Sequence, residues 1–235
     1  MLIDQYLTAE GSLIHFTREQ ASLFAKQVAD DFNPIHDPDA KRFCVPGDLL
    51  FAVALSRVGL SQRMHVNFTD MVTDGVKLTF PAESSKQISI ADEQGKHYLD
   101  IECEGENTRE SGVIDALTRQ YVEFSGHTFP HILVPLWAEN GVMINPARPL
   151  VIYQSMSIEL ERLDLIAPRL EIAGTDLDVQ GKRGNVQLSF NLLDGDLKVG
   201  TGEKRMVLSG LREFDQEQVD GIVDFYNRRK DEAGF

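Results

Sequence analysis

The first periodic stretch of the chain, residues 15–31, predicts an amphipathic helix. Its apolar side chains recur at the spacing of one helical face: Ala21, Phe24, Ala25 and Val28. Thr17 and Gln20, three positions apart, form a capping-box pattern that satisfies free amide groups of a first turn. The pattern stops at Asp31, and Pro34 sterically disfavours helix at the residue before it. We therefore expect a loop to begin here.

A second helix is predicted over residues 48–62, where the sequence reads DLLFAVALSRVGLSQ. Asp48 follows Pro46 and Gly47 and is the expected N-cap of this helix. The turns that follow are apolar on every side, which is typical of a helix buried in the middle of a fold.

Beyond this helix the chain alternates apolar and polar residues, as β-strands do. Strand-like runs are VKLTF, KQISIAD, HYLDIECE and VIDALTRQYVEF, with DEQG as a hairpin turn. The second half repeats this order: HILVPLWAENGV is compatible with a helix, and three long strand-like runs follow it. Asp194-Gly195 is a strong hairpin signal between two of them. An amphipathic helix capped by Asp215 closes the sequence.

This order predicts an α+β fold made of two halves, residues 1–125 and 126–235. Each half has a helix ahead of an antiparallel sheet. The halves share negligible sequence identity, so the repeat is one of architecture.

Composition narrows the function classes. The 235 residues are 42% hydrophobic, enough for a sizeable core, and carry a formal net charge of −14. This charge argues against binding to nucleic acid or to an anionic membrane, since both require a positive field. The longest apolar run, Leu49 to Leu55, is too short to cross a bilayer. Cys44 and Cys103 are isolated, as in a reducing compartment. We expect a soluble, cytoplasmic protein.

The loop between the two predicted helices reads DDFNPIHDPDA, and it concentrates proton-handling groups. Asn33-Pro34 makes a sharp turn, which can fold Asp31 and His36 back to face one space. A carboxylate and an imidazole around one water molecule can take up a proton at one point and deliver it at another. Gly47 adds a helix N-terminus that can stabilise an oxyanion. The alternative is purely structural, with Asp31 capping the backbone and His36 partly buried.

These residues resemble the D-x-N-P-[IL]-H motif of the MaoC-like (R)-specific enoyl-CoA hydratases. The resemblance implies a hotdog fold, in which an antiparallel sheet wraps a long apolar helix, here as a double hotdog. It implies Asp31 and His36 as a catalytic dyad that hydrates a trans-2-enoyl thioester without a cofactor. Asn33 would set the dyad, and the Gly47 amide would meet the thioester oxygen. The clear motif covers about thirty residues of the sequence.

Several positions depart from that family's pattern. Ala29 and Asp30 stand where the family has a small residue and a glycine, and Pro46 stands where it has a histidine. The loop after His36 is also shorter. The second half has Asn145-Pro146 but no histidine after it, so at most one active site is expected.

Other candidate residues have less support. Lys41, Arg42 and Arg63 are candidates to contact the phosphates of coenzyme A, the alternative being ordinary surface charge. His127 and His131 lie four apart, but Pro130 between them breaks the helix that would align them as ligands, so no metal site is expected.

Three functions remain open from the sequence. The first is a hydro-lyase that adds water to an acyl thioester or removes it. The second is an acyl-CoA thioesterase of the hotdog type, which needs a carboxylate but not the paired histidine. The third is a non-catalytic acyl-binding or regulatory protein that retains the fold. A homodimer is possible, because exposed sheet edges favour pairing.

Overall fold

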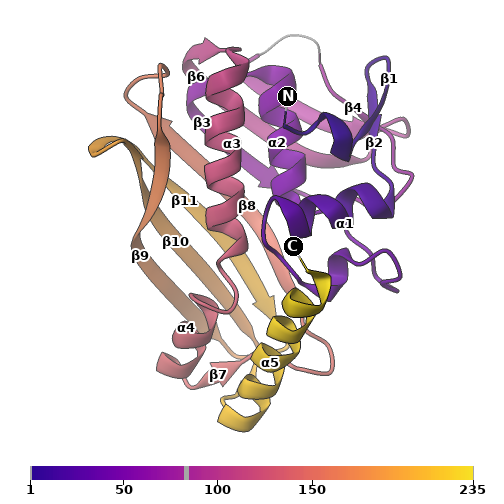
Figure 1. The fold of residues 1–235 in the computed structure, drawn as a ribbon, viewed down its shortest axis with the longest axis vertical. Coiled ribbons are helices and arrows are strands. Elements are labelled where there is room, and N and C mark those ends of the chain that lie inside the picture. Colours follow the sequence, from indigo (N-terminus) through magenta and orange to yellow (C-terminus); the bar gives the residue numbers. More distant parts are fainter. Residues whose placement is uncertain (1, 82–84, 235) are drawn as a thin grey trace.

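The computed structural model describes residues 2–81 and 85–234. Its strands form one ten-stranded antiparallel sheet and one two-stranded sheet. The long helices α1, α2 and α3 lie together over one face of the large sheet, and α5 lies beside its lower end in Figure 1. The helical segments are η1 Asp4–Tyr6, α1 Arg18–Gln27, η2 Pro34–His36, α2 Gly47–Val58, α3 Ser111–Gly126, α4 Leu133–Glu139 and α5 Gln216–Ala233.

The large sheet has the order β1-β2-β4-β5-β6-β3-β8-β11-β10-β9. Its strands, with the two short strands β7 and β12 of the second sheet, are β1 Thr8–Glu10, β2 Leu13–His15, β3 Leu60–Phe68, β4 Leu78–Thr79, β5 Gln87–Asp92, β6 His97–Thr108, β7 Val142–Met143, β8 Val151–Leu160, β9 Pro168–Gln180, β10 Arg183–Asp194, β11 Leu197–Ser209 and β12 Arg212–Glu213. Strands from the first part of the sequence therefore lie together, and so do those from the second.

The two groups of strands meet where β3 pairs with β8. Val66 lies opposite Met156 in this pair, and both side chains are buried. Hydrogen bonding along the pair makes the two half-sheets one continuous sheet, rather than two sheets packed against each other.

The predicted capping box at the start of α1 is confirmed. The Gln20 amide donates to the Thr17 hydroxyl at 3.1 Å, and the Thr17 amide donates to the Gln20 side chain at 3.0 Å. Ala21, Phe24 and Ala25 are fully buried, as the apolar stripe predicted. Helix α1 is therefore firmly packed where it leads into residues 30–40, the DDFNPIHDPDA segment, which we call the motif loop.

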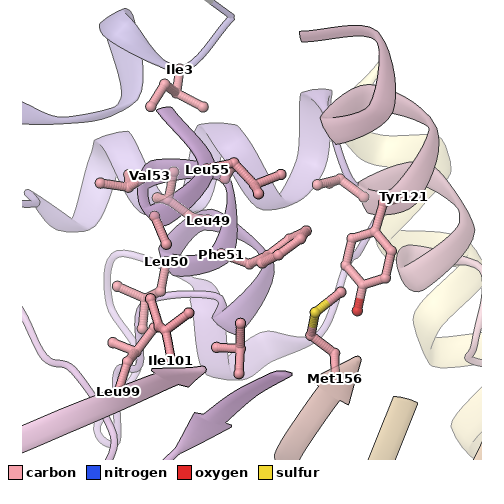
Figure 2. Packing of buried hydrophobic residues seen from close by; sticks show 14 of the residues in the cluster. Ile3, Leu49, Leu50, Phe51, Val53, Leu55, Leu99, Ile101, Tyr121 and Met156 are labelled. Carbon is pink, nitrogen blue, oxygen red and sulfur yellow. The ribbon is translucent and has the colours of Figure 1, made fainter. Parts of the chain in front are cut away.

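Helix α2 is the central element of the core, as the sequence predicted. Its buried residues come from every side of the helix: Leu49, Leu50, Phe51, Ala52, Val53, Ala54, Leu55 and Val58. Figure 2 shows five of them in one hydrophobic cluster with Leu99 and Ile101 of β6, Met156 of β8 and Tyr121 of α3; the five are Leu49, Leu50, Phe51, Val53 and Leu55. The N-cap prediction was wrong, because the helix begins at Gly47 with Pro46 as N-cap. Asp48 is inside the first turn.

The strand predicted from VIDALTRQYVEF is also wrong, because this segment is the sixteen-residue helix α3. Its buried side chains follow helical spacing: Ile114, Leu117, Thr118, Tyr121, Val122 and Ser125. β-branched and aromatic residues gave the segment its strand character. Packing against α2, where Tyr121 meets Phe51 edge-on at 4.9 Å between ring centroids, outweighs that preference.

The helix predicted from HILVPLWAENGV is confirmed as the short helix α4. Its Trp137 is fully buried in a second hydrophobic cluster, together with Val219 of α5 and residues of β10 and β11. The Asp215 cap of α5 is confirmed as well, since its side chain accepts a hydrogen bond from the Gln218 amide at 3.1 Å.

An antiparallel sheet thus curves around two long helices, α2 from the first part of the sequence and α3 ahead of the second group of strands. This is the α+β hotdog fold with an added C-terminal helix. The division of the chain at residues 125 and 126 remains a prediction; it falls at the last turn of α3.

Candidate active site

Three backbone amides of the motif loop donate hydrogen bonds that fix its path from the end of α1. The Asp31 amide donates to the Ala25 carbonyl at 2.8 Å, which ties the loop to the last turn of α1. The Asn33 amide donates to Asp31 Oδ1 at 2.9 Å, and the Ile35 amide donates to Asn33 Oδ1 at 3.2 Å. Two consecutive side-chain turns therefore bend the chain, as expected for Asp and Asn in such a loop.

The bend brings the two predicted dyad residues together. Asp31 Oδ2 and His36 Nε2 face each other at 3.6 Å, and both side chains are largely but not fully buried. This separation exceeds a direct hydrogen bond, so the two groups face each other without being bonded. Asp31 accepts the hydrogen bond from the Asn33 amide through Oδ1, whereas Oδ2 faces His36. The structural role and the predicted dyad role therefore involve different oxygen atoms.

The other nitrogen of His36 fixes the ring. His36 Nδ1 lies 2.7 Å from the Cys44 carbonyl oxygen, which can only accept a hydrogen bond. Nδ1 therefore carries the hydrogen, and in the neutral ring Nε2 holds the lone pair that faces Asp31. The Cys44 amide in turn donates to the Ile35 carbonyl at 3.1 Å, so the acceptor belongs to the same loop. Burial raises the pKa of the Cys44 thiol to about 12, so this group stays neutral.

Helix α5 supports the loop from the far end of the sequence. Tyr226 is buried, and its hydroxyl accepts a hydrogen bond from the Phe32 amide at 3.1 Å and donates to the Asp30 carbonyl at 3.1 Å. Arg229 donates to the Phe32 carbonyl at 3.1 Å, and Lys230 pairs with the Asp30 carboxylate. The sequence placed Tyr226 on the apolar stripe of this helix but gave it no role in the site. Arg229 and Lys230 were not singled out, because no local pattern distinguishes them from the exposed polar residues of an amphipathic helix.

A buried polar cluster, formed by Asp48, Ser125 and Lys204, lies beside the dyad and was not predicted either. The Ser125 hydroxyl donates to Asp48 Oδ2 at 2.6 Å and accepts from the Lys204 ammonium group. Lys204 also lies 4.4 Å from the centre of the Tyr153 ring, a cation–π contact. The cluster joins the start of α2, the end of α3 and the middle of β11.

Charge links this cluster to the dyad. Burial raises the pKa of the Asp48 carboxyl, with Asp31 adding to the rise and Lys204 opposing it. Burial lowers the pKa of Lys204, while attraction to Asp48 and to Asp31 acts in the other direction. The buried Lys204 ammonium group is therefore attracted to two carboxylates, those of Asp48 and Asp31. The available signal was that Lys204 stands two positions before Met206 and four before Leu208 in the strand, so it shares the face of these buried residues.

Gly47 lies at the N-terminus of α2 and has an independent packing requirement. A Cβ atom at this position would lie 2.7 Å from Tyr153 Cδ1 and 3.4 Å from Phe68 Cε1. A larger residue here would therefore displace the aromatic pair Phe68–Tyr153, whose ring centroids are 4.4 Å apart. Its role toward a thioester oxygen remains a prediction.

The three basic residues predicted to contact coenzyme A are separated by the fold. Lys41 and Arg42 are exposed in the loop between His36 and α2. Arg63 lies on the outer face of β3, since Met64 and Val66 next to it point into the core. There it pairs with Glu104 at 3.0 Å and lines a groove of about 520 Å³ with Glu102 and Glu159. The structure does not bring Arg63 to the dyad.

His127 and His131 have ring centroids 6.0 Å apart, and His127 Nε2 lies 3.4 Å from Asp30 Oδ2. Within residues 2–81 and 85–234, no three His, Cys, Asp or Glu side chains are placed to hold a metal ion. None of the helices in this described part is long and apolar enough to span a membrane.

Solved structures with a related arrangement share little sequence with this chain. A conserved hot dog fold protein of unknown function from Alicyclobacillus acidocaldarius is 9% identical, with a TM-score of 0.45 over 89% of this chain and 98% of that one. An acyl-CoA thioesterase II from Mycobacterium marinum is 9% identical, with a TM-score of 0.40 over 92% and 99%. The bifunctional dehydratase-cyclase domain of ambruticin biosynthesis is 11% identical, with a TM-score of 0.36 over 93% and 98%.

No curated protein matches the sequence. The chain belongs to the family described as "Protein of unknown function (DUF3581)", whose model matches residues 1–217. The matched range includes the motif loop and the buried polar cluster, whereas nearly all of α5 lies beyond it.

Proposed function

We propose that this protein is a hydro-lyase that adds water to the double bond of a 2-enoyl thioester, or removes water in the reverse direction. The observation that carries the proposal is the pairing of His36 Nε2 with Asp31 Oδ2 across 3.6 Å, while Nδ1 is held by the Cys44 carbonyl. A lone pair and a carboxylate that border one space are what general acid–base hydration requires. The resemblance of the DFNPIH segment to the MaoC-like motif agrees with this reaction.

In the proposed step, a water molecule that contacts both groups from one side loses one proton to His36 Nε2. Its oxygen bonds to C3 of the enoyl group as the double bond moves to form an enolate. The Asp31 carboxylate accepts a hydrogen bond from the water and stabilises the imidazolium ion that forms. The proton then passes from the dyad to C2, which restores the neutral ring. The hydroxyl group of the added water is then on C3 and its other proton on C2, so the step balances without a cofactor.

The enolate oxygen requires a hydrogen-bond donor, which we assign to the N-terminus of α2. The amides of Leu49 and Leu50 already donate to the Pro46 carbonyl at 3.1 and 3.2 Å. Within the part of the chain that the structure describes, no residue accepts a hydrogen bond from the Gly47 amide. The positive end of the helix dipole acts at the same point.

The test is hydration of crotonyl-CoA, followed by loss of the enoyl absorbance, in the wild-type protein and three variants. Asp31→Asn and His36→Gln should each lower kcat by roughly 100-fold or more, since each removes one proton-handling group. Asp39→Asn is the matched control, because Asp39 is exposed in the same loop. Turnover that is unchanged in Asp31→Asn would exclude this mechanism.

Two other outcomes identify the alternatives. Hydrolysis of a saturated acyl-CoA that survives His36→Gln would identify a thioesterase, because hydrolysis needs a carboxylate but not the pair. Tight binding of acyl-CoA without turnover of either substrate would identify a binding protein that retains the fold.

A further inference from the structure

The residue immediately before the dyad carboxylate has an unfavourable backbone conformation. Asp30 has φ = 53°, in the left-handed region, and among the described residues it is the only one other than glycine with a positive φ. A side chain at Cβ disfavours this region, although Asp tolerates it better than most residues do. Because Asp31 follows directly, the direction of its side chain depends on Asp30 keeping this conformation.

Helix α5 holds Asp30 by both its backbone and its side chain. The Tyr226 hydroxyl donates to the Asp30 carbonyl at 3.1 Å and accepts from the Phe32 amide at 3.1 Å. One phenol thus binds the peptide groups on both sides of Asp31. The Asp30 carboxylate pairs with Lys230 of the same helix, and His127 lies 3.4 Å from it.

The phenol is rigidly placed and chemically suited to this role. Its ring packs edge-on against Phe129 and Phe32, with centroid distances of 5.0 and 6.1 Å. Burial raises the pKa of Tyr226, so the hydroxyl keeps the hydrogen that it donates to Asp30. Arg229 adds a hydrogen bond to the Phe32 carbonyl at 3.1 Å.

We infer that Tyr226 is a positioning residue of the dyad: together with Lys230, it holds Asp30 in the left-handed conformation and so directs Asp31 toward His36. The inference rests on the proposed function for its kinetic consequence, but the placement of Asp31 can be measured without turnover. It assigns a role in the site to α5, since Tyr226 lies 196 residues from Asp30 in the sequence.

The test is a double-mutant cycle between Tyr226→Phe and Asp30→Gly. The phenylalanine keeps the ring packing and removes only the hydroxyl. In the wild-type background it should lower kcat for crotonyl-CoA roughly 10- to 100-fold with little change in KM, as expected when a catalytic group is misplaced. Glycine adopts φ = 53° without strain. In the Asp30→Gly background, Tyr226→Phe should therefore lower kcat less than it does in the wild type, and the two fold-decreases should differ by about threefold or more.

A second readout does not depend on activity. The ¹⁵N chemical shifts of the His36 imidazole report how closely Asp31 faces it, so Tyr226→Phe should move them and Asp30→Gly/Tyr226→Phe should return them toward the wild-type values. Tyr98→Phe is the matched control, because the hydroxyl of Tyr98 on β6 donates to Asp92 of β5 at 3.3 Å. It should leave kcat and the His36 shifts unchanged, and thermal unfolding confirms that each variant is folded.

The two proposals fail in different ways. If the wild-type protein hydrates no enoyl thioester but Tyr226→Phe still moves the His36 shifts, the function is wrong and the positioning role stands. If Tyr226→Phe changes neither kcat nor the shifts, or has equal effects in the wild-type and Asp30→Gly backgrounds, the positioning role is wrong.

Discussion

Lys204 on β11 and Asp48 in the first turn of α2 share one partner, the hydroxyl of Ser125 at the end of α3. The carboxylate and the ammonium group are both buried. This link connects three elements around the candidate dyad and leaves Asp48 Oδ1 without a hydrogen-bond partner among the described residues. A buried charge in such a place depends on its counter-charge.

Replacing Lys204 with methionine should therefore destabilise the fold strongly. The change leaves the Asp48 carboxylate buried without a cation, which typically costs about 3–5 kcal/mol. The measurement is urea unfolding followed by the fluorescence of Trp137, the single tryptophan of the chain. Lys198→Met on the same strand is the control, because Lys198 is exposed. Asp48→Asn/Lys204→Met should recover part of the lost stability, and equal losses for Lys198→Met and Lys204→Met would contradict the assignment.

Asp48 should also affect the pH dependence of stability. Its folded-state pKa is raised above the ordinary value of 3.8, so the folded protein binds the Asp48 proton more tightly than the unfolded chain does. The contribution of this group is therefore fully present below pH 3.8 and is lost as the pH rises from that value through the folded-state pKa. The substitution Asp48→Asn removes the titrating carboxyl group and therefore this loss of stability with rising pH. The free energy of unfolding of the wild type relative to Asp48→Asn should decrease from about pH 4 upward, and a constant difference would refute the raised pKa.

Gly47→Ala should be destabilising even if the residue has no catalytic role. The new methyl group would lie 2.7 Å from Tyr153 Cδ1, so the ring must move. Overpacking of this kind costs about 1–3 kcal/mol. Gly221→Ala is the control, because a Cβ there meets no atom within 4 Å in α5. The control should stabilise the protein by about 0.5–1 kcal/mol, the usual gain of alanine over glycine inside a helix.

Steady-state kinetics can show which of the basic residues predicted to bind coenzyme A contribute to substrate binding. Lys41→Ala/Arg42→Ala should raise KM for crotonyl-CoA severalfold but not for crotonyl-pantetheine, which lacks the nucleotide phosphates. Arg63→Ala should change neither value, because Arg63 lies on the outer face of the sheet with Glu104. A rise of KM in Arg63→Ala alone would place the nucleotide on the outer face instead.

Local signals in the sequence predicted much of this architecture. Thr17 with Gln20 marked the start of α1, and Asp194-Gly195 marked the turn between β10 and β11, because caps and hairpin turns depend on neighbouring residues. The juxtaposition of Asp31 and His36 belongs to the same class, since the Asn33-Pro34 turn that joins them is local. Such features can be read without knowledge of the tertiary fold.

The rest depends on contacts between distant segments. Segment 113–124 carries strand-forming residues and becomes helical because its buried side chains pack on α2. The partners of Lys204 and Tyr226 are far away in the sequence, so only the folded chain shows that Lys204 binds Ser125 and that Tyr226 binds the backbone beside Asp31. The helical spacing of buried positions in α3 was the one available signal that the strand prediction overlooked.

The span of these contacts has a consequence for how the protein is made. Tyr226 binds the backbone beside Asp31 across 194 residues, and Lys204 meets Ser125 across 79. Such long-range contacts form late, because they require closure of large loops. On the ribosome, the first group of strands can begin to pair around α2 while the dyad still lacks both supports. A nascent chain that stops before α5 is therefore expected to carry Asp31 and His36 in an unaligned form, and the candidate dyad is expected to align only after α5 has been synthesised.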